Sequence, residues 1–126
     1  MKQGNDLKLI TKAQELATYT IKLTSNCNKF PKKYRFTVCD RMQRVSMDIY
    51  EFLLDANRTP LSELKDRVRL QTKAINNCDK LLFYIKMCVD LEIITINSAE
   101  FWSKLVSDIK FMTISWRTKD KNRQSA

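Results

Sequence analysis

The segment from Phe30 to Asn57 carries hydrophobic residues that recur at alternating steps of four and three residues. This spacing places them on one side of a helix, as in helices that pack lengthwise against other helices. Pro31 disfavours helical geometry at the residue before it, so the helix is predicted to begin at Lys32 or Lys33. Its apolar seam consists of Val38, Met42, Val45, Ile49, Phe52 and Ala56.

Similar spacing predicts one helix before this segment and another after it. The earlier helix runs from a cap at Asp6 to about Asn26. The later helix begins at Thr59–Pro60, a pair that suits the N-cap and the first helical position. Its only strongly polar seam residue, Gln71, indicates either a buried amide that sets the register or a helix that bends near residues 75–77. The two seams are Leu9, Ala13, Leu16, Thr20, Leu23 and Cys27, and Leu61, Leu64, Val68, Gln71, Ile75, Cys78, Leu82, Ile85 and Val89.

A fourth helix is predicted after residues 92–97, whose sequence EIITIN is the one β-like patch of the chain. A single strand would have no partner, so we interpret this patch as a tight connection between helices. Asn97 is then the predicted N-cap, with Glu100 in the capping-box position three residues later. The seam of this helix is Phe101, Leu105, Ile109, Met112 and Trp116, widened by Trp102, Val106 and Thr113.

Four amphipathic helices with short connections predict an all-α fold, an antiparallel up-down-up-down four-helix bundle. One glycine and two prolines among 126 residues agree with long helices and few loops. The length indicates one domain, which we assign to residues 1–118. Residues 119–126 are predicted to form a basic, disordered tail.

The charge of the chain gives the first indication of what it binds. The chain has 23 Lys and Arg residues against 14 Asp and Glu residues, a net charge of +9, which attracts nucleic acid or an anionic membrane. Residues 29–47 hold six bases and one acid, an arrangement that the dipole of the second predicted helix disfavours and that a bound polyanion would explain. The candidate nucleic-acid-binding residues are Lys29, Lys32, Lys33, Arg35, Arg41 and Arg44, with a second group at Lys65, Arg67, Arg69 and Lys73.

Two interpretations of the first basic group remain open from the sequence. Long cationic side chains can follow the phosphates of a nucleic acid, and Tyr34 could stack on an exposed base. The same residues also fit a solvated charged face, with Phe30, Tyr34 and Phe36 closing the end of the bundle. For Arg35, an ion pair with Asp40 or another carboxylate that positions the turn is a further alternative.

Residues that usually carry catalysis are scarce. The chain has no histidine, which removes the commonest general base and metal ligand, and no Glu-x-x-His pair of the kind that binds metals in helix bundles. Its one glycine, Gly4, excludes a glycine-rich phosphate-binding loop. We therefore expect no enzymatic activity, no catalytic residue, no metal site and no cofactor.

The four cysteines, Cys27, Cys39, Cys78 and Cys88, lack the spacing of zinc or redox motifs. Three of them lie at apolar helical positions and are expected to be buried as small hydrophobic residues. The alternative for Cys39 is a reactive thiol, because Arg35 and Arg41 nearby could lower its pKa.

The amino-terminal residues contain no apolar run typical of a signal peptide, and no stretch approaches the roughly 18 apolar residues of a membrane span. We therefore expect a cytoplasmic protein without a membrane partner and without a disulfide framework.

The segment from Phe30 to Arg58 resembles a family of small bacterial four-helix-bundle proteins. That family includes the accessory variability determinant (Avd) of diversity-generating retroelements and the proteins encoded by intervening sequences in ribosomal RNA genes. The spacing of residues 81–116 and the closing Trp116 are also similar, so the resemblance covers about residues 7–118. The chain departs from the family pattern at Cys39 and at residues 114–115, where the family often has glycine. The matching positions are Phe30, Pro31, Lys32, Arg35, Phe36, Thr37, Arg41, Ala56 and Asn57.

The resemblance implies a homopentameric ring with a positively charged surface that assists a reverse transcriptase and binds its RNA or DNA, without catalysis of its own. It also implies that Arg41 and its basic neighbours contact the nucleic acid. Outside the seams, Trp102, Phe111 and Tyr84 are candidate contacts with sister subunits, although Trp102 and Tyr84 also fit the bundle core. The alternatives are a protein-protein interaction module or structural bundle with no nucleic-acid role, and a nuclease, for which the sequence offers no acid-base pair.

Overall fold

The computed structural model describes residues 3–125 of the chain and the side chains of residues 8–123. Every regular element in this part is a helix, which confirms the predicted all-α class. The α-helices are α1 (Gln3–Thr24), α2 (Asp40–Arg58), α3 (Leu64–Asp90) and α4 (Ile96–Ser125). Shorter segments are the 3₁₀-helices η1 (Lys32–Tyr34) and η3 (Leu61–Glu63) and the π-helix η2 (Arg35–Cys39).

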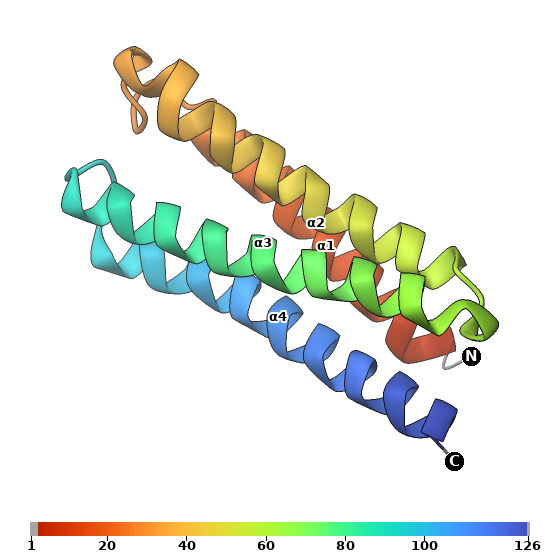
Figure 1. Ribbon diagram of the computed structural model, residues 1–126. Coiled ribbons are helices and arrows are strands. Elements are labelled where there is room, and N and C mark those ends of the chain that lie inside the picture. The colour runs from red at the N-terminus through yellow and green to blue at the C-terminus, as the bar shows by residue number, and fades with distance from the viewer. Residues whose placement is uncertain (1–2, 126) are drawn as a thin grey trace.

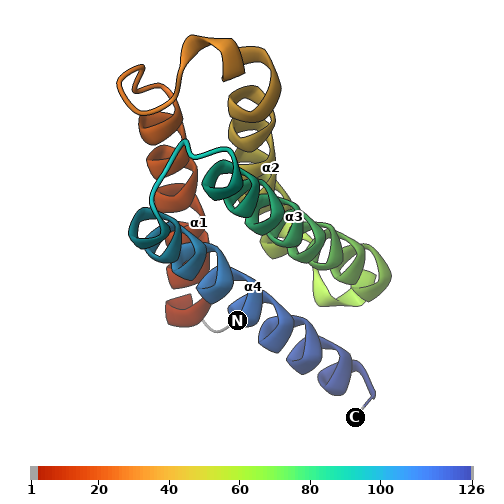
Figure 2. The ribbon, with the colours of Figure 1, turned by 90° about the vertical axis from the view of Figure 1, so that its left-hand side faces the viewer.

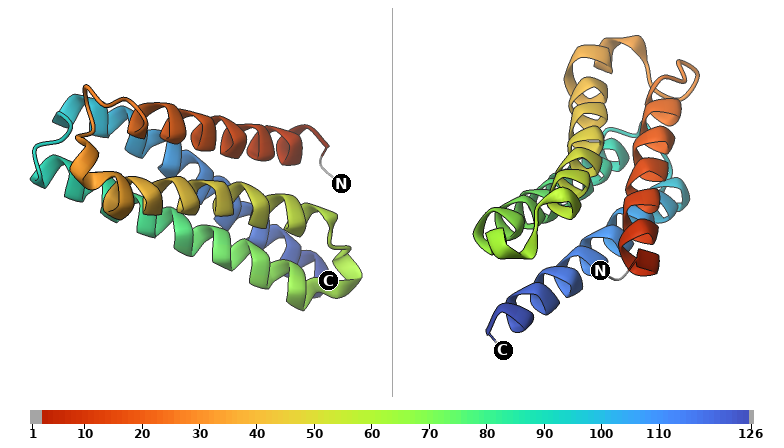
Figure 3. Two further views of the ribbon diagram at one scale, coloured as in Figure 1. Left: turned by 90° about the horizontal axis from the view of Figure 1, so that it is seen from above. Right: turned by 90° about the vertical axis from the view of Figure 1, so that its right-hand side faces the viewer.

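Successive helices run in opposite directions and pack side by side, as the prediction of an up-down-up-down bundle required (Figure 1). The most extensive packing joins α2 to α3 and α3 to α4, and α1 packs mainly on α2. Helix α4 begins beside α1 and diverges from it toward its own carboxyl end (Figure 2). The α1–α2 and α3–α4 connections therefore lie at one end of the bundle, and the α2–α3 connection lies at the other (Figure 3).

The predicted seams form most of the core, with departures on every helix. Cys27 follows the end of α1 and is exposed. Leu53, Leu81 and Cys88 are completely buried, whereas the neighbouring seam residues Phe52, Leu82 and Val89 are partly exposed.

Helix α4 shows a similar shift. Trp102 is completely buried, whereas Phe101, predicted as the first seam residue, is 57% exposed. The indole Nε1 of Trp102 donates a hydrogen bond to Thr20 Oγ1 at 3.1 Å, which explains why a threonine lies on the buried side of α1. Val106 and Thr113, which only widened the predicted seam, are also completely buried.

A buried ion pair connects α3 to the last turns of α4. Arg67 Nε donates to Asp120 Oδ2 at 2.7 Å, and Gln71 Nε2 donates to the same oxygen at 2.8 Å. Gln71 is completely buried, so of the two interpretations of this residue the structure supports the buried amide.

The carboxyl end of α4 differs from the predicted disordered tail at residues 119–126. Helix α4 continues to Ser125, because Asp120 follows Trp116 by one turn and keeps its carboxylate against α3.

Three predicted helix caps are wrong. Helix α1 begins at Gln3, so Asp6 lies within it and does not cap it. At the other two positions, threonine hydroxyls have roles that differ from the prediction. Thr59 Oγ1 donates to Asp55 O at 2.8 Å, so this hydroxyl ends α2 instead of starting α3. Thr95, not Asn97, caps α4: its Oγ1 accepts the backbone N–H of Ser98 at 3.2 Å. Residues 91–95 connect α3 to α4, and the patch at residues 92–97 forms no strand in the described chain, as predicted.

Candidate nucleic-acid interface

The first basic group lies at the end of the bundle that holds the α1–α2 connection (Figure 1). We call Lys29, Lys32, Lys33, Arg35, Arg41 and Arg44 the α1–α2 basic cluster. A side chain within the connection anchors it: Phe30 is 2% exposed and meets Trp102 edge-on, with ring centroids 6.4 Å apart. Backbone bonds from Lys29 and Phe30 to Asn26 O, at 3.0 and 2.8 Å, close the turn before the cluster. The cluster is therefore held on an ordered segment that is attached to the core.

The π-helix η2 decides which residues of this segment face outward. In a continuous α-helix, Arg35 would lie two turns before Met42 and on the same, core-facing side. The π-turn holds one more residue than an α-turn, and the backbone N–H of Asp40 bonds to Arg35 O across it. This extra residue rotates the preceding turn, so Arg35 is exposed instead of facing the core, while Val38 and Cys39 stay buried. Phe36, next to Arg35, is exposed as well. The hydrophobic spacing of the sequence does not show this change of register.

All six side chains of the α1–α2 basic cluster are exposed. Only Arg44 has an ion pair in the described part of the chain, with its Nε 2.9 Å from Asp40 Oδ2. Asp40 therefore pairs with Arg44. The alternative ion pair between Arg35 and Asp40 does not form. The other five cations have no described carboxylate within salt-bridge distance, so this end of the bundle has a concentrated positive charge.

A cavity of about 310 Å³ opens beside the cluster, between the end of α1 and the start of α2. Lys32 and Arg35 contribute cations to its lining, and Phe36 contributes an aromatic ring. A hydrogen bond from Gln43 Nε2 to Thr24 Oγ1, at 2.8 Å, joins the two helices at its wall. The cavity therefore combines two cations with the Asp40 carboxylate, hydrogen-bonding groups and the rings of Phe36 and Phe30.

The aromatic residues of the segment do not have the roles expected from the sequence. Tyr34, the predicted stacking residue, is only partly exposed, and Lys33 Nζ lies 5.2 Å from its ring centroid. Phe36 was considered as a residue that closes the bundle end, yet it is 84% exposed. Phe36 is thus the accessible aromatic face of the cluster, a role that the sequence alone did not indicate.

The second predicted group, on the first half of α3, is less uniform. Lys65, Arg69 and Lys73 are exposed, but Arg67 is 8% exposed and its guanidinium is taken up by the Asp120 carboxylate. The Nη1 atom of Arg67 donates to Thr59 O at 2.9 Å, and the Cζ atom of Arg67 lies 5.0 Å from the Trp116 ring centroid. Arg67 therefore holds α3 and α4 together and offers no free cation to a phosphate.

The two basic groups lie at opposite ends of the bundle, because α2 runs from one to the other (Figure 1). Its 19 residues correspond to about 28 Å at ~1.5 Å per residue. The carboxyl end of α4 lies at the same end as the second group and brings further basic residues there (Figure 3). Its exposed bases are Lys119, Lys121 and Arg123, which the sequence interpretation had assigned to a disordered tail.

The cysteines of the bundle are unpaired, and three of them are buried as expected. Burial raises the pKa of Cys39, and this effect outweighs the nearby Arg35, which acts to lower it. The alternative of an activated Cys39 thiolate is therefore not supported. Burial also raises the pKa values of Cys78 and Cys88 to about 12, so these thiols stay protonated at neutral pH.

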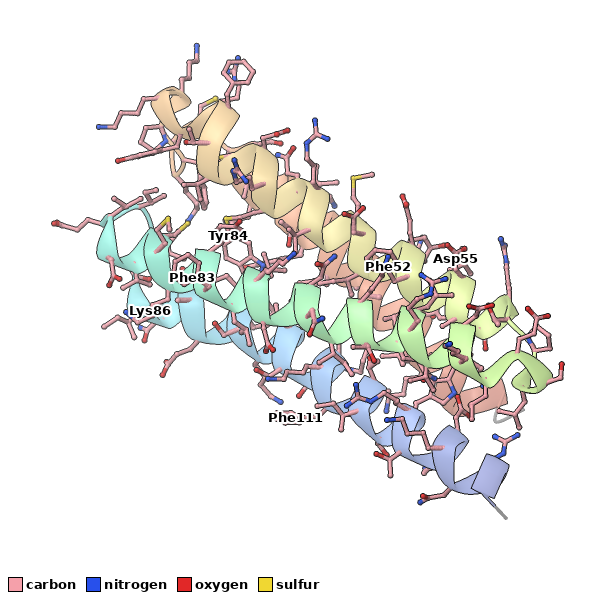
Figure 4. All side chains as sticks on the ribbon, viewed as in Figure 1. Phe52, Asp55, Phe83, Tyr84, Lys86 and Phe111 are labelled. Atoms are coloured by element: carbon pink, nitrogen blue, oxygen red, sulfur yellow. The ribbon has the colours of Figure 1, made fainter. Side chains whose placement is uncertain are left out.

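The candidate subunit contacts divide into buried and exposed side chains. Trp102 belongs to the core, so its alternative role there is the one the structure supports. Tyr84 is partly buried against the core and lies between α3 and α2, whereas Phe111 is 63% exposed at the outer edge of α4 (Figure 4). Phe83 and Phe101 are also more than half exposed. Apolar side chains are thus available for contacts on α3 and α4.

The described residues provide neither a metal-binding cluster nor a membrane-spanning helix. No group of three or more His, Cys, Asp or Glu side chains is arranged to hold a metal ion. None of the described helices combines the length and the apolar character that crossing a membrane requires.

Comparison with known proteins identifies the fold. No protein-family model matches the chain, and no curated protein matches it. A similar solved structure is the crystal structure of a protein of unknown function from the S23 ribosomal protein family of Bacteroides thetaiotaomicron. It superposes with a TM-score of 0.79 over 90% of this chain and 98% of that chain, at 17% sequence identity. The chain therefore shares the helical-bundle fold of that protein.

Proposed function

We propose that this protein is a cytoplasmic, non-catalytic accessory protein that binds nucleic acid through the α1–α2 basic cluster. The observation that carries the proposal is that Lys29, Lys32, Lys33, Arg35 and Arg41 are exposed with no described carboxylate within salt-bridge distance. Cations without an internal partner can neutralise phosphates without first losing an ion pair, and they release counterions from the nucleic acid when they do so. Arginine also binds phosphate oxygens through two parallel hydrogen bonds.

The proposal extends to assembly and to the enzyme that is assisted. We propose a homopentameric ring that acts with a reverse transcriptase of the diversity-generating retroelement type. Support for this comes from the resemblance of residues 30–58 to the Avd family and from the shared bundle fold. The exposed Phe83, Phe101 and Phe111 offer apolar surface for subunit contacts.

Neutralising two unpaired cations tests the binding site. We expect Lys33→Gln with Arg41→Gln to weaken binding of RNA and DNA, and to reduce the slope of log affinity against log salt concentration by about two, one for each lost phosphate contact. Binding of labelled RNA and duplex DNA across a salt series measures both quantities. The matched control is Lys8→Gln with Lys80→Gln, which removes the same charge from exposed positions outside the cluster.

Circular dichroism of both double variants should show unchanged helicity, because all four side chains are exposed. Equal affinity and equal salt slope for the two double variants would contradict the assignment of the site. If the unmodified protein binds neither nucleic acid at low salt, the protein-protein interaction module is the better explanation of its positive surface.

A further inference from the structure

We propose that the α1–α2 end of the bundle binds single-stranded nucleic acid, and that an unpaired base stacks on Phe36 beside the 310 Å³ cavity. This inference rests on the proposed function and adds the class of nucleic acid and the residue that recognises it. It assigns a role to the most exposed large hydrophobic side chain of the described residues.

The exposure of Phe36 is the first observation. At 84% it exceeds that of every other large hydrophobic side chain described, the next being Ile96 at 66%. Phe36 lies in the π-helix on the side away from Val38 and Cys39, which remain in the core. An aromatic ring on a segment that Phe30 attaches to the core offers an accessible stacking surface, and stacking accepts any base because every base has a π-face.

The surroundings of Phe36 are the second observation. Arg35 Cζ lies 6.0 Å from its ring centroid, and Lys32 and Arg35 line the same cavity as the ring. A strand that places one base on the ring would bring its adjacent phosphates among these cations. Gln43 lines the cavity wall and offers its amide oxygen to the edge of a base, whereas Thr24 Oγ1 is already bonded to Gln43 Nε2 and to Thr20 O. The volume lies at the lower end of the roughly 300–1,000 Å³ found for small-molecule sites.

Charge and the accessibility of the bases favour a single strand over a second copy of this chain or a regular duplex. A second copy of the same face would bring the five unpaired cations of each chain against one another, which is unfavourable. A regular duplex keeps its bases stacked inside the helix and presents no free base to Phe36. A flexible single strand supplies phosphates and accessible bases together, as this combination of groups requires.

Binding of three probes by two variants tests the inference. The probes are a labelled oligouridine of about ten nucleotides, an abasic strand of the same length and charge, and an RNA duplex. Phe36→Ala should lower the affinity for the oligouridine by roughly 5- to 100-fold, since base-aromatic stacking contributes about 1–3 kcal/mol per base. Its affinity for the abasic strand and the duplex should not change, because phosphate contacts remain.

Phe36→Trp should retain tight binding of the oligouridine and add a spectroscopic signal. Trp102 and Trp116 are at most 9% exposed, so the new indole would be the accessible one, and base stacking should quench its fluorescence. The abasic strand should leave that fluorescence unchanged. Both variants should keep the helicity of the unmodified protein, because residue 36 lies outside the core.

The outcomes separate the two proposals. Equal affinity of Phe36→Ala and the unmodified protein for the oligouridine would overturn the stacking inference. If Lys33→Gln with Arg41→Gln still weakened binding in that case, the proposed function would stand. Tighter binding of the duplex than of the single strand by the unmodified protein would also overturn the inference. No binding of any probe at low salt would overturn the proposed function as well.

Discussion

At the scale of single residues, the contact between Arg67 and Asp120 carries the largest expected effect on stability. Asp120 is completely buried and accepts hydrogen bonds from Arg67 and Gln71, while Arg123 Nη1 lies 3.6 Å from its other oxygen. Removing one partner of a buried ion pair leaves an uncompensated charge, whereas removing both leaves an apolar contact. The sequence showed a basic run on α3 but gave no sign that one of its members is consumed internally.

Asp120→Ala is therefore expected to lower the free energy of unfolding by about 3–5 kcal/mol, because Arg67 would remain buried without its carboxylate. The double variant Arg67→Met with Asp120→Leu should recover much of that loss, since apolar replacements remove the unpaired charge. Urea unfolding measures both values. A single variant with a loss below about 1 kcal/mol would show that the pair is solvated, as surface pairs are.

At the scale of secondary-structure elements, the end of α3 contains a measurable strain. Glu92 has φ 60°, the left-handed conformation that favours glycine. The backbone N–H groups of Ile93 and Glu92 bond to Cys88 O and Val89 O, both at 2.8–2.9 Å, which is the Schellman arrangement that follows a helix. A residue with a Cβ costs about 1–2 kcal/mol in this conformation.

Glu92→Gly should therefore raise the free energy of unfolding by about 1 kcal/mol, because glycine adopts this conformation without the steric cost. Thermal or urea unfolding measures the change. Glu92→Ala is the matched control: it removes the same carboxylate but retains the Cβ, so we expect no comparable gain. Equal stabilisation by both variants would attribute the effect to charge instead of backbone conformation.

At the scale of the whole molecule, the two basic groups lie at opposite ends, and exposed aromatic residues lie on α3 and α4 (Figures 1 and 4). Under the proposed function, this separation would let one surface bind nucleic acid while another contacts sister subunits. Phe83 and Phe111 have 58% and 63% of their surface exposed in the single chain, and burial in an assembly would remove that apolar area from water.

Light scattering should accordingly give a mass several times that of the 14.9 kDa subunit. Phe83→Asp with Phe111→Asp should shift the protein toward the monomer, because a charge in an apolar contact is unfavourable. Phe36→Asp should leave the mass unchanged, since we assign that residue to nucleic acid. A monomeric mass for the unmodified protein at every concentration would contradict the ring.

The sequence by itself determined the helical class, the antiparallel order of the helices and most of the core. A repeat of three and four residues specifies which side of a helix is buried, whatever that side packs against. It also placed the α1–α2 basic cluster on one helix end, because those cations are close in sequence. Exposed charges near one another along the chain need no tertiary information to be found.

Only the tertiary structure decided the points that depend on residues far apart in the chain. The pairing of Arg67 with Asp120, 53 residues later, removed one predicted contact and extended α4 beyond the predicted boundary. The π-turn at Arg35–Cys39 turned Arg35 away from the core by a change in backbone hydrogen bonding that hydrophobic spacing does not encode. Register and partner choice arise from the packing of whole helices against one another, which is why local periodicity could not specify them.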